Sequence, residues 1–307
     1  MVETVRVGII GGTGLGEALL GGMEPEGVES HDVETPFGPP SAAIVTGRFG
    51  EVAIALLKRH GDGHHLSPAA VPYRANVYAL KALGCTHLVA SGATGSLRQE
   101  IAPGDLVLCD QLIDRTGGRE RTFYERAAVH VEFADPCCPV LRRWLLGAAK
   151  ALPEVTVHPR GTYVCMEGPS FSTRAESHLH RAWGADVVGM TALPEARLAR
   201  EAEIAYALIA LPTDYDCWRR PEMPPGHETG GPDQESLLAE IMGNLNRATD
   251  ASIRLIKAAL ADVAPLRATP SPAHDALALA IWSDKSAIDP DEIKRLDVLW
   301  GRRFGES

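Results

Sequence analysis

Apolar positions along the chain gather first into short runs rich in β-branched residues. Several of these runs are apolar at nearly every position, as strands are when both of their faces are buried in a sheet. The eight runs are Val5–Ile10, Ala42–Val45, Val52–Leu57, His87–Ala90, Leu106–Cys109, Gly161–Met166, Asp186–Gly189 and Ala205–Leu211. Each run is predicted to be a strand.

Between these runs lie stretches in which apolar residues recur every three or four positions, which places them on one face of a helix. The clearest are Tyr73–Leu83, Pro139–Leu152, Thr173–Trp183, Pro194–Glu203 and Gln234–Ala261. Because strands and helices alternate, residues 1–263 are predicted to form a single α/β domain, in which a central mixed sheet is flanked by helices in three layers.

Residues 264–307 follow a different pattern. Ala264–His274 is broken by prolines and is predicted to be a connector. From Asp275 onward we expect a C-terminal helical appendage that packs on the same domain or on a neighbouring subunit. Within it, Ala276–Trp282 is apolar enough either to be a core helix, which we prefer, or to close a ligand pocket. Arg219–Asp233 is polar and rich in proline and glycine, so it is predicted to be a surface loop and a candidate lid.

Charge and cysteine usage narrow the class of protein. Forty acidic against 30 basic residues give a formal net charge of −10, and Lys and Arg are not clustered with aromatic residues. Nucleic-acid binding is therefore not expected as the main role. The six cysteines form no CxxC pair, which favours reduced thiols over a disulfide frame or a structural zinc site. With no apolar run of about 18 residues and no leader pattern, we expect a cytoplasmic protein with no membrane segment.

Ligands of an open α/β sheet bind beyond the carboxyl ends of its strands, so the residues after each apolar run are candidates for chemistry. After the first run, the glycine turn Gly11–Gly16 offers N–H groups to an anion, although it lacks the dinucleotide fingerprint and a simple tight turn is the alternative. After the third run come Arg59 and His60, a guanidinium beside an imidazole, which suits an oxyanion. The alternative there is a metal site built from His60, His64 and His65.

Small and hydroxyl residues follow two further runs. Ser91–Ser96 is predicted to be a turn dense in N–H groups that would suit the same anion. Farther along, Ser172 or Thr173 can cap the next helix, and Glu176 can complete the capping box.

The sequence TDYDCW, residues 213–218, follows the last apolar run. Because side chains alternate along a strand, Asp214 and Asp216 are predicted to point to one face and Tyr215 to the other. Two carboxylates could then address one edge of a ligand. A turn or cap role for the aspartates and a metal-binding DxD pair are the alternatives.

Six segments between Val5 and Trp218 follow one another along the chain in this order: GGTG, RHG, SGATGSL, MEGPSFSTRAE, GMTALPEARLAREA and TDYDCW. Together they resemble the purine nucleoside phosphorylase superfamily, most closely its methylthioadenosine phosphorylase branch. The resemblance implies a nucleoside phosphorylase-like fold. It also implies that a nucleoside reacts with inorganic phosphate, the co-substrate, to give a free base and a pentose 1-phosphate. It further implies no metal, no organic cofactor, and a homotrimer or a dimer of trimers.

The resemblance also gives roles to single positions. It implies a phosphate site made of Thr13, Arg59, His60, the backbone of Ala93, and Thr191. It implies that Met190 lies under the sugar, that Phe171 and Ser172 line the purine, that Asp214 and Asp216 read its imidazole and 6-amino edges, and that His130 reaches into the neighbouring subunit's site. Asp214, Asp216 and His60 are the residues expected to take part in catalysis.

The chemistry of the reaction agrees with these roles. Breaking the N-glycosidic bond builds positive charge on the sugar and negative charge on the purine, so the site needs an anion on one side and a proton donor on the other. Asp214 can be that donor at N7 if burial and its neighbour raise its pKa above the free value of about 3.9. Asp216 would accept from a 6-amino group, whereas a 6-oxo group would meet it acceptor to acceptor.

The expected reaction is thus phosphorolysis of S-methyl-5′-thioadenosine to adenine and 5-methylthioribose 1-phosphate. One alternative is a 6-oxopurine or general purine nucleoside phosphorylase, because Asp114–Thr122 is similar to a sibling branch that cleaves methylthioinosine. Another is a nucleotide-binding protein or a metal-dependent hydrolase that uses the histidine loop. Three positions depart from the family pattern: Gly92 replaces a hydroxyl residue, Ser170 a basic residue and Glu132 a proline.

Overall fold

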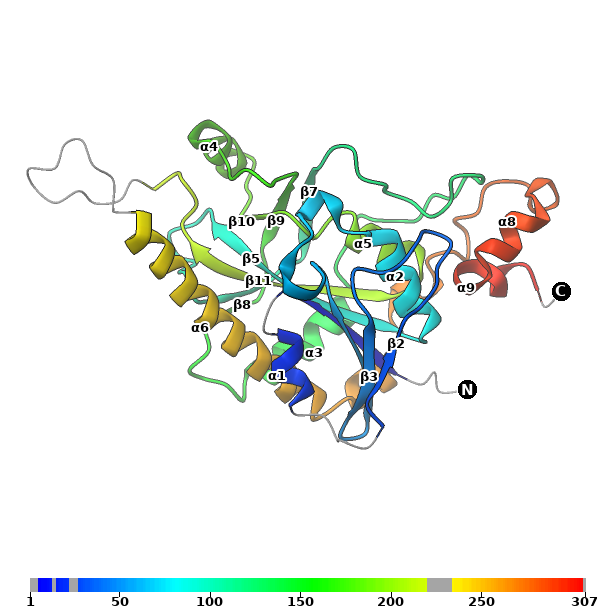
Figure 1. Ribbon diagram of the computed structural model, residues 1–307, viewed down its shortest axis with the longest axis horizontal. Coiled ribbons are helices and arrows are strands. Elements are labelled where there is room, and N and C mark those ends of the chain that lie inside the picture. The colour runs from blue at the N-terminus through cyan, green and yellow to red at the C-terminus, as the bar shows by residue number, and fades with distance from the viewer. Residues whose placement is uncertain (1–4, 13–14, 22–26, 220–233, 306–307) are drawn as a thin grey trace, which may run out of the picture.

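A computed structural model describes residues 5–12, 15–21, 27–219 and 234–305 of the chain (Figure 1). Its strands form one mixed sheet with helices on both faces. The main path runs β2 (Glu29–His31), β3 (Ile44–Phe49), β4 (Val52–Lys58), β1 (Arg6–Gly11), β5 (His87–Ser96), β10 (Val187–Gly189), β9 (Thr162–Met166) and β7 (Gln111–Arg115). A branch leaves β5 through β11 (Ala205–Asp214), β6 (Leu106–Leu108) and β8 (Val157–His158).

Two hydrophobic cores lie on the two faces of this sheet, and β11 contributes to both. Its residues Ala205, Ala207, Ile209 and Leu211 join the core under α1 (Leu15–Leu20), α3 (Pro139–Ala149), α6 (Gln234–Leu260) and α7 (Ala264–Ala268). The intervening Tyr206, Leu208 and Ala210 join the core under α2 (Tyr73–Ala82) and α5 (Glu195–Glu201). This alternation explains why the run is apolar throughout. The predicted three-layer α/β fold is confirmed.

The long strand β5 is where the sheet forks. Its residues His87–Ala90 pair with β1, while Gly95 and Ser96 pair with β10. Between these two pairings, residues 91–94 are paired only with β11, on the other side. The prediction of a turn at Ser91–Ser96 is therefore wrong: the small residues continue the strand, and they form a stretch of open edge between β1 and β10.

All eight predicted strands and all five predicted helices are present, with ends shifted by a few residues. The prediction missed β2, β7 and β8, because these short strands are exposed or half-buried and carry no apolar run. At α4 (Arg174–Ala182), Thr173 is the N-cap, and Glu176 closes the predicted capping box.

The C-terminal tail differs from its prediction in two places. The expected connector contains the short helix α7. Ala276–Trp282 is not a core helix: it forms turns and a bridge, in which His130 N donates to Ala280 O (2.9 Å) and Trp282 N donates to Ala128 O (2.9 Å). The turns end where residues 280–282 pair with residues 128–130. The helices α8 (Pro290–Arg295) and α9 (Asp297–Trp300) follow at the end of the molecule (Figure 1).

Side chains of the tail enter the core on the α2 face. Trp300 is fully buried and stacks on Tyr124 with ring centroids 4.8 Å apart. Arg302 and Arg303 form ion pairs with the buried Glu203. Short 3₁₀ helices complete the chain at Asp62–His64, Pro68–Ala70, Pro272–Asp275, Lys285–Ala287 and Gly301–Arg303.

Two sequence expectations concern chemistry outside the site. The six cysteines are free thiols, and Cys217 is the one that is not fully buried. Among the described helices, none combines the length and apolarity needed to cross a membrane.

Candidate active site

A cavity of about 350 Å³ lies against the open edge of β5. Its walls come from the segments after β4, β9, β10 and β11, together with α6. It contains nine of the predicted site residues: Arg59, His60, Ala93, Phe171, Ser172, Met190, Thr191, Asp214 and Asp216. Thr13 lies outside the described residues, as does most of the predicted lid; Gly12, beside Thr13, lines the cavity.

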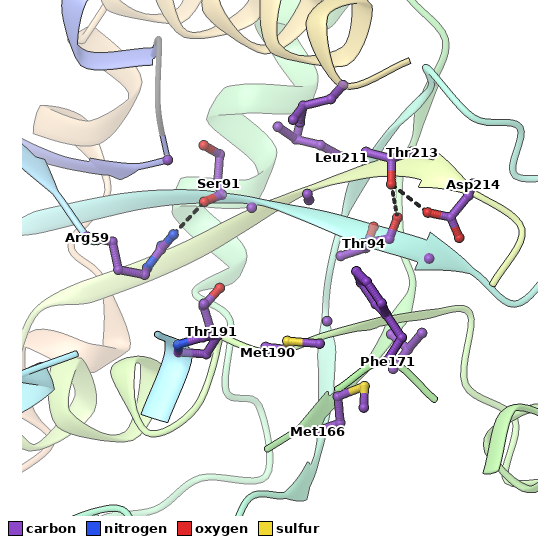
Figure 2. A pocket seen from close by; sticks show the side chains of 18 of the residues that line it. Arg59, Ser91, Thr94, Met166, Phe171, Met190, Thr191, Leu211, Thr213 and Asp214 are labelled. Atoms are coloured by element: carbon purple, nitrogen blue, oxygen red, sulfur yellow. Dashed lines mark hydrogen bonds between the residues drawn. The ribbon is translucent and has the colours of Figure 1, made fainter. Parts of the chain in front are cut away.

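Figure 2 shows that the cavity has two polar ends. Arg59 and Thr191 lie at one end, and Asp214 and Phe171 at the other, with Met190 between them. Met166, Val188 and Leu211 add apolar side chains to the lining.

Arg59 is held by a carboxylate that sequence reasoning did not assign to the site. Its Nε and Nη2 donate to the two oxygens of Glu195 (2.8 and 3.1 Å), and its Nη1 donates to Ser91 O (2.8 Å). Both side chains of the pair are 1% exposed. Burial lowers the pKa of Arg59, but the Glu195 carboxylate more than offsets this and raises it above its ordinary value. Two of the five N–H groups of the guanidinium remain for a ligand.

His60 is oriented by the backbone. Its Nδ1 lies 2.8 Å from Leu66 O, which can only accept, so Nδ1 carries the proton. Burial lowers the pKa of His60 to about 4, against the Leu66 bond, and the charges of Arg59 and His64 lower it further. His60 is therefore neutral at pH 7, and its Nε2 is an acceptor.

The open edge of β5 brings backbone close to this cationic end. A Cβ on Gly92 would lie 3.2 Å from Thr191 Oγ1 and 3.9 Å from Arg59 Nη1. Glycine thus leaves space beside both groups, and it supplies no hydroxyl of its own. Within the described residues, the buried Thr94 Oγ1 has no hydrogen-bond partner, and Thr94 lines the cavity. Its hydroxyl is available to a ligand.

The acid pair is arranged by a turn and not by strand alternation. β11 ends at Asp214, and Asp216 has a positive φ of 48°. Asp216 N donates to Asp214 Oδ1 (2.7 Å). A Cβ on Gly95 would lie 3.0 Å from Asp216 Cβ, so glycine in β5 allows this turn to pack closely. Both carboxyls line the cavity, as predicted, but the alternation argument for it is wrong.

Each carboxyl of the pair has a hydroxyl neighbour, Thr213 at Asp214 and Ser177 at Asp216. Thr213 Oγ1 lies 2.7 Å from Asp214 Oδ2 and 3.3 Å from Thr94 O, yet it has a single proton for these two contacts (Figure 2). The shorter contact, to the Asp214 carboxylate, is the better placed to take that proton. Burial raises the pKa of Asp216, against the Ser177 hydroxyl, and the charge of Asp214 raises it further.

Two loops that line the cavity are joined by Arg119, whose role the sequence did not reveal. The guanidinium donates to Met190 O (2.8 Å), Leu193 O (2.7 Å) and Glu167 O (2.6 Å), and also to the Glu167 carboxylate. It lies in Asp114–Thr122, the segment noted for its similarity to the sibling branch. Arg119 thereby ties the loop before Phe171 to the loop that carries Met190.

Two other expectations from the sequence concern His130 and a histidine metal site. His130 is exposed, does not line the cavity of its own chain, and stacks beside Trp282 (centroids 4.5 Å apart). No group of three or more potential metal ligands occurs among the described residues, so the proposed histidine metal site does not form there. His60 and His64 instead stack at 4.2 Å. Leu245 and Thr249 of α6 line the cavity and were missed, because nothing in a helical pattern distinguishes a wall from a core face.

Comparisons with known proteins identify the family of the chain. Residues 6–261 match the family model described as the phosphorylase superfamily. S-methyl-5′-thioadenosine phosphorylase of Thermosynechococcus vestitus is 50% identical over 80% of this chain and 80% of its own; that of Geobacter sulfurreducens is 46% identical over 96% and 98%. A crystal structure of methylthioadenosine phosphorylase from an antarctic soil metagenomic library has a TM-score of 0.84 and 41% identity, covering 97% of this chain and 99% of that chain.

A second solved structure carries a ligand. Methylthioadenosine phosphorylase from Schistosoma mansoni in complex with adenine has a TM-score of 0.78 and 36% identity, and the match covers 91% of this chain and all of that one. The chain therefore belongs to the phosphorylase superfamily, in the group of the S-methyl-5′-thioadenosine phosphorylases.

Proposed function

We propose that this protein catalyses the phosphorolysis of S-methyl-5′-thioadenosine to adenine and 5-methylthioribose 1-phosphate. The observation that carries the proposal is the opposition of a buried guanidinium and an acid pair across one apolar cavity. Phosphorolysis of a glycosidic bond needs an anion on one side of the sugar and a proton donor on the other. The relatives named above support the methylthio nucleoside as the substrate.

The cationic end suits the phosphate. The two remaining N–H groups of Arg59, the Thr191 hydroxyl and the backbone at Ala93 would donate to phosphate oxygens. Neutral His60 would accept the hydroxyl proton of a monohydrogen phosphate at Nε2. The bound anion then lies beside the sugar and stabilises the positive charge that develops there.

The acidic end suits the purine. Phe171 and Ser172 would line the base, and Met190 would lie under the sugar. Asp214 would give the proton that N7 takes up as the bond breaks, and Asp216 would accept from the 6-amino group. A 6-oxo group would meet the same carboxylate as an acceptor, which disfavours inosine.

We further propose that the enzyme needs no metal and no organic cofactor, that it works in the cytoplasm, and that it is a homotrimer. His130 supports the last of these: it lies exposed next to Trp282 and Leu279, which are 70% and 91% exposed. An apolar surface of this kind suits a neighbouring subunit, whose site His130 would then enter. The shared core supports a tail that belongs to the same domain as residues 1–263.

The direct test is adenine release from S-methyl-5′-thioadenosine, with and without inorganic phosphate, with inosine and methylthioinosine alongside. Phosphate-dependent adenine release with little turnover of the 6-oxo nucleosides is expected. Faster cleavage of inosine would leave the phosphate site in place and overturn the role of the acid pair. Adenine release without phosphate would make the protein a hydrolase and contradict the role of Arg59.

Arg119→Lys is expected to lower kcat and raise the KM for the nucleoside together. Lysine cannot reach the carbonyls of Met190, Leu193 and Glu167 at once, so buried acceptors are left without donors. That costs about 1–3 kcal/mol of stability per group and releases both loops. Steady-state kinetics and thermal unfolding check this. Arg254→Lys, at a half-exposed ion pair with Glu154, is the matched control and should change neither.

A further inference from the structure

Behind the acid pair, three residues each have a buried polar atom without a hydrogen-bond partner, and the Ser177 hydroxyl also lies near the Cys217 thiol. The three atoms are Asp216 Oδ2, Ser177 Oγ and His180 Nδ1, and none makes a hydrogen bond of normal geometry with any described residue. Ser177 is 0% exposed and His180 is 4% exposed. Because both residues lie on α4, three positions apart, they share one face of the helix. An unpaired polar group in such a place is costly, so the three atoms call for an explanation.

Two of the three groups, Ser177 and His180 of the helix, lie near the third, the Asp216 carboxyl. The Ser177 hydroxyl lies beside the Asp216 carboxyl and interacts with it, and His180 lies within electrostatic range of Asp216. The α4 helix begins directly after Phe171 and Ser172, which line the cavity. Asp216 therefore has two neighbours: its carboxyl lines the cavity and also interacts with Ser177 of the helix.

When Asp216 is ionised, counting donors and acceptors gives one arrangement in which every member of this cluster has a hydrogen-bond partner. His180, neutral with its proton on Nδ1, donates to Ser177 Oγ, and Ser177 donates its only proton to Asp216 Oδ2. The arrangement stabilises a carboxylate, since a hydrogen bond to the charged form favours that form. It leaves the cavity-side oxygen of Asp216 as an acceptor.

Other groups around the cluster either oppose or favour the negative charge on Asp216. Asp214 opposes the negative charge of Asp216, and the N–H of Cys217 favours it. His180 also faces Glu176 from its own helix and Arg115 from β7. Because two carboxyls share one cavity, the pair needs something that decides which of the two is ionised.

We propose that Ser177 and His180 are positioning residues that keep the negative charge of the acid pair on Asp216 and its proton on Asp214. The inference rests on the proposed function. It assigns the preference for a 6-amino over a 6-oxo purine to a hydrogen-bonded chain that does not touch the base. Asp214 then has the proton that N7 needs, and Asp216 has the lone pair that the amino group needs.

The test uses Ser177→Ala and His180→Phe, which remove the two donors and keep much of the shape. His180→Asn is the matched variant, because its amide N–H can occupy the place of Nδ1–H. Two quantities are measured: the pH profile of kcat/KM for S-methyl-5′-thioadenosine and for methylthioinosine, and the dissociation constants of adenine and hypoxanthine by calorimetry between about pH 5 and pH 9. Thermal unfolding of each variant shows whether it is folded.

Without the hydrogen bonds from His180 to Ser177 and from Ser177 to Asp216, Asp216 should hold its proton to higher pH. Activity on the aminopurine depends on ionised Asp216 and falls as the pH drops through its pKa. We therefore expect the acid limb to move up by about one pH unit in Ser177→Ala and in the same direction in His180→Phe. The 6-amino over 6-oxo ratio should fall about tenfold, in turnover and in base binding, and His180→Asn should restore both.

Unchanged acid limbs and unchanged base preference in folded Ser177→Ala and His180→Phe would overturn the proposal. So would an equal loss in His180→Phe and His180→Asn, which would make the role of the ring one of packing. A wild-type protein that neither turns over the nucleosides nor binds adenine would instead contradict the proposed function. Adenine binding to wild type, measured without turnover, separates these two failures.

Discussion

Changing both Asp214 and Asp216 to asparagine is expected to abolish phosphorolysis of S-methyl-5′-thioadenosine while the protein stays folded. Asparagine matches aspartate in shape, but it neither holds a transferable proton nor carries the charge. Loss of general acid catalysis alone costs about 10²–10⁴-fold in rate. Adenine release under saturating phosphate measures the loss, and thermal unfolding reports the fold.

Single variants separate the two roles. Asp214→Asn should lose turnover on every purine, because N7 is present in all of them. Asp216→Asn should lose the 6-amino preference, since an amide can turn its N–H₂ toward a 6-oxo group. Near-normal adenine release by the double variant would remove the acid pair from the mechanism.

Arg59→Gln is expected to damage both phosphate binding and stability, and a second substitution should separate the two effects. Glu195 would be left 1% exposed with its charge unpaired, apart from a hydrogen bond from Tyr206 (3.0 Å). Breaking a buried pair by removing one partner costs about 3–5 kcal/mol. The KM for phosphate should rise by about 30-fold or more, because a charge-assisted contact is lost.

The double variant Arg59→Gln/Glu195→Gln removes both charges at once. It should recover most of the thermal stability and none of the phosphate binding. Unfolding curves and the phosphate dependence of turnover check the two halves. Recovery of activity in the double variant would mean that Arg59 serves the fold and not the phosphate, and the assignment would fail.

Much of the fold follows from the pattern of apolar residues, because burial on both faces of a sheet demands continuous apolar runs. Val52–Leu57 and Ala205–Leu211 were predicted as strands for that reason. Ser91–Ser96 was not, since half of its residues are glycine or alanine, which have low strand propensity. Pairing of Ser91–Gly95 with β11 overrides that propensity, and a single sequence does not show such pairing.

The candidate site was predictable as a set of strand ends and not as a set of contacts. Arg59 and the aspartates each follow a strand, and the sheet brings those ends together. Glu195 is 136 positions from Arg59, so the ion pair that fixes the guanidinium exists only in three dimensions. The role of Arg119 could not be predicted for the same reason. It donates to backbone carbonyls, which every residue has, so no side chain in the sequence marks its partners. The positive φ of Asp216 has no signature in a residue that is not glycine.

The open edge of β5 has a consequence for how the substrate range of this enzyme can be altered. Residues 91–94 line the cavity, and their main chain is paired with β11 on its other side. Substitution there leaves the main-chain donors unchanged, and movement of the strand would disturb the central sheet. The side walls are built by separate elements: the segment before α4 and one face of α6. Redesign toward other nucleosides should therefore begin at Leu245, Thr249 and Phe171, where a side chain can change size without unpairing a strand.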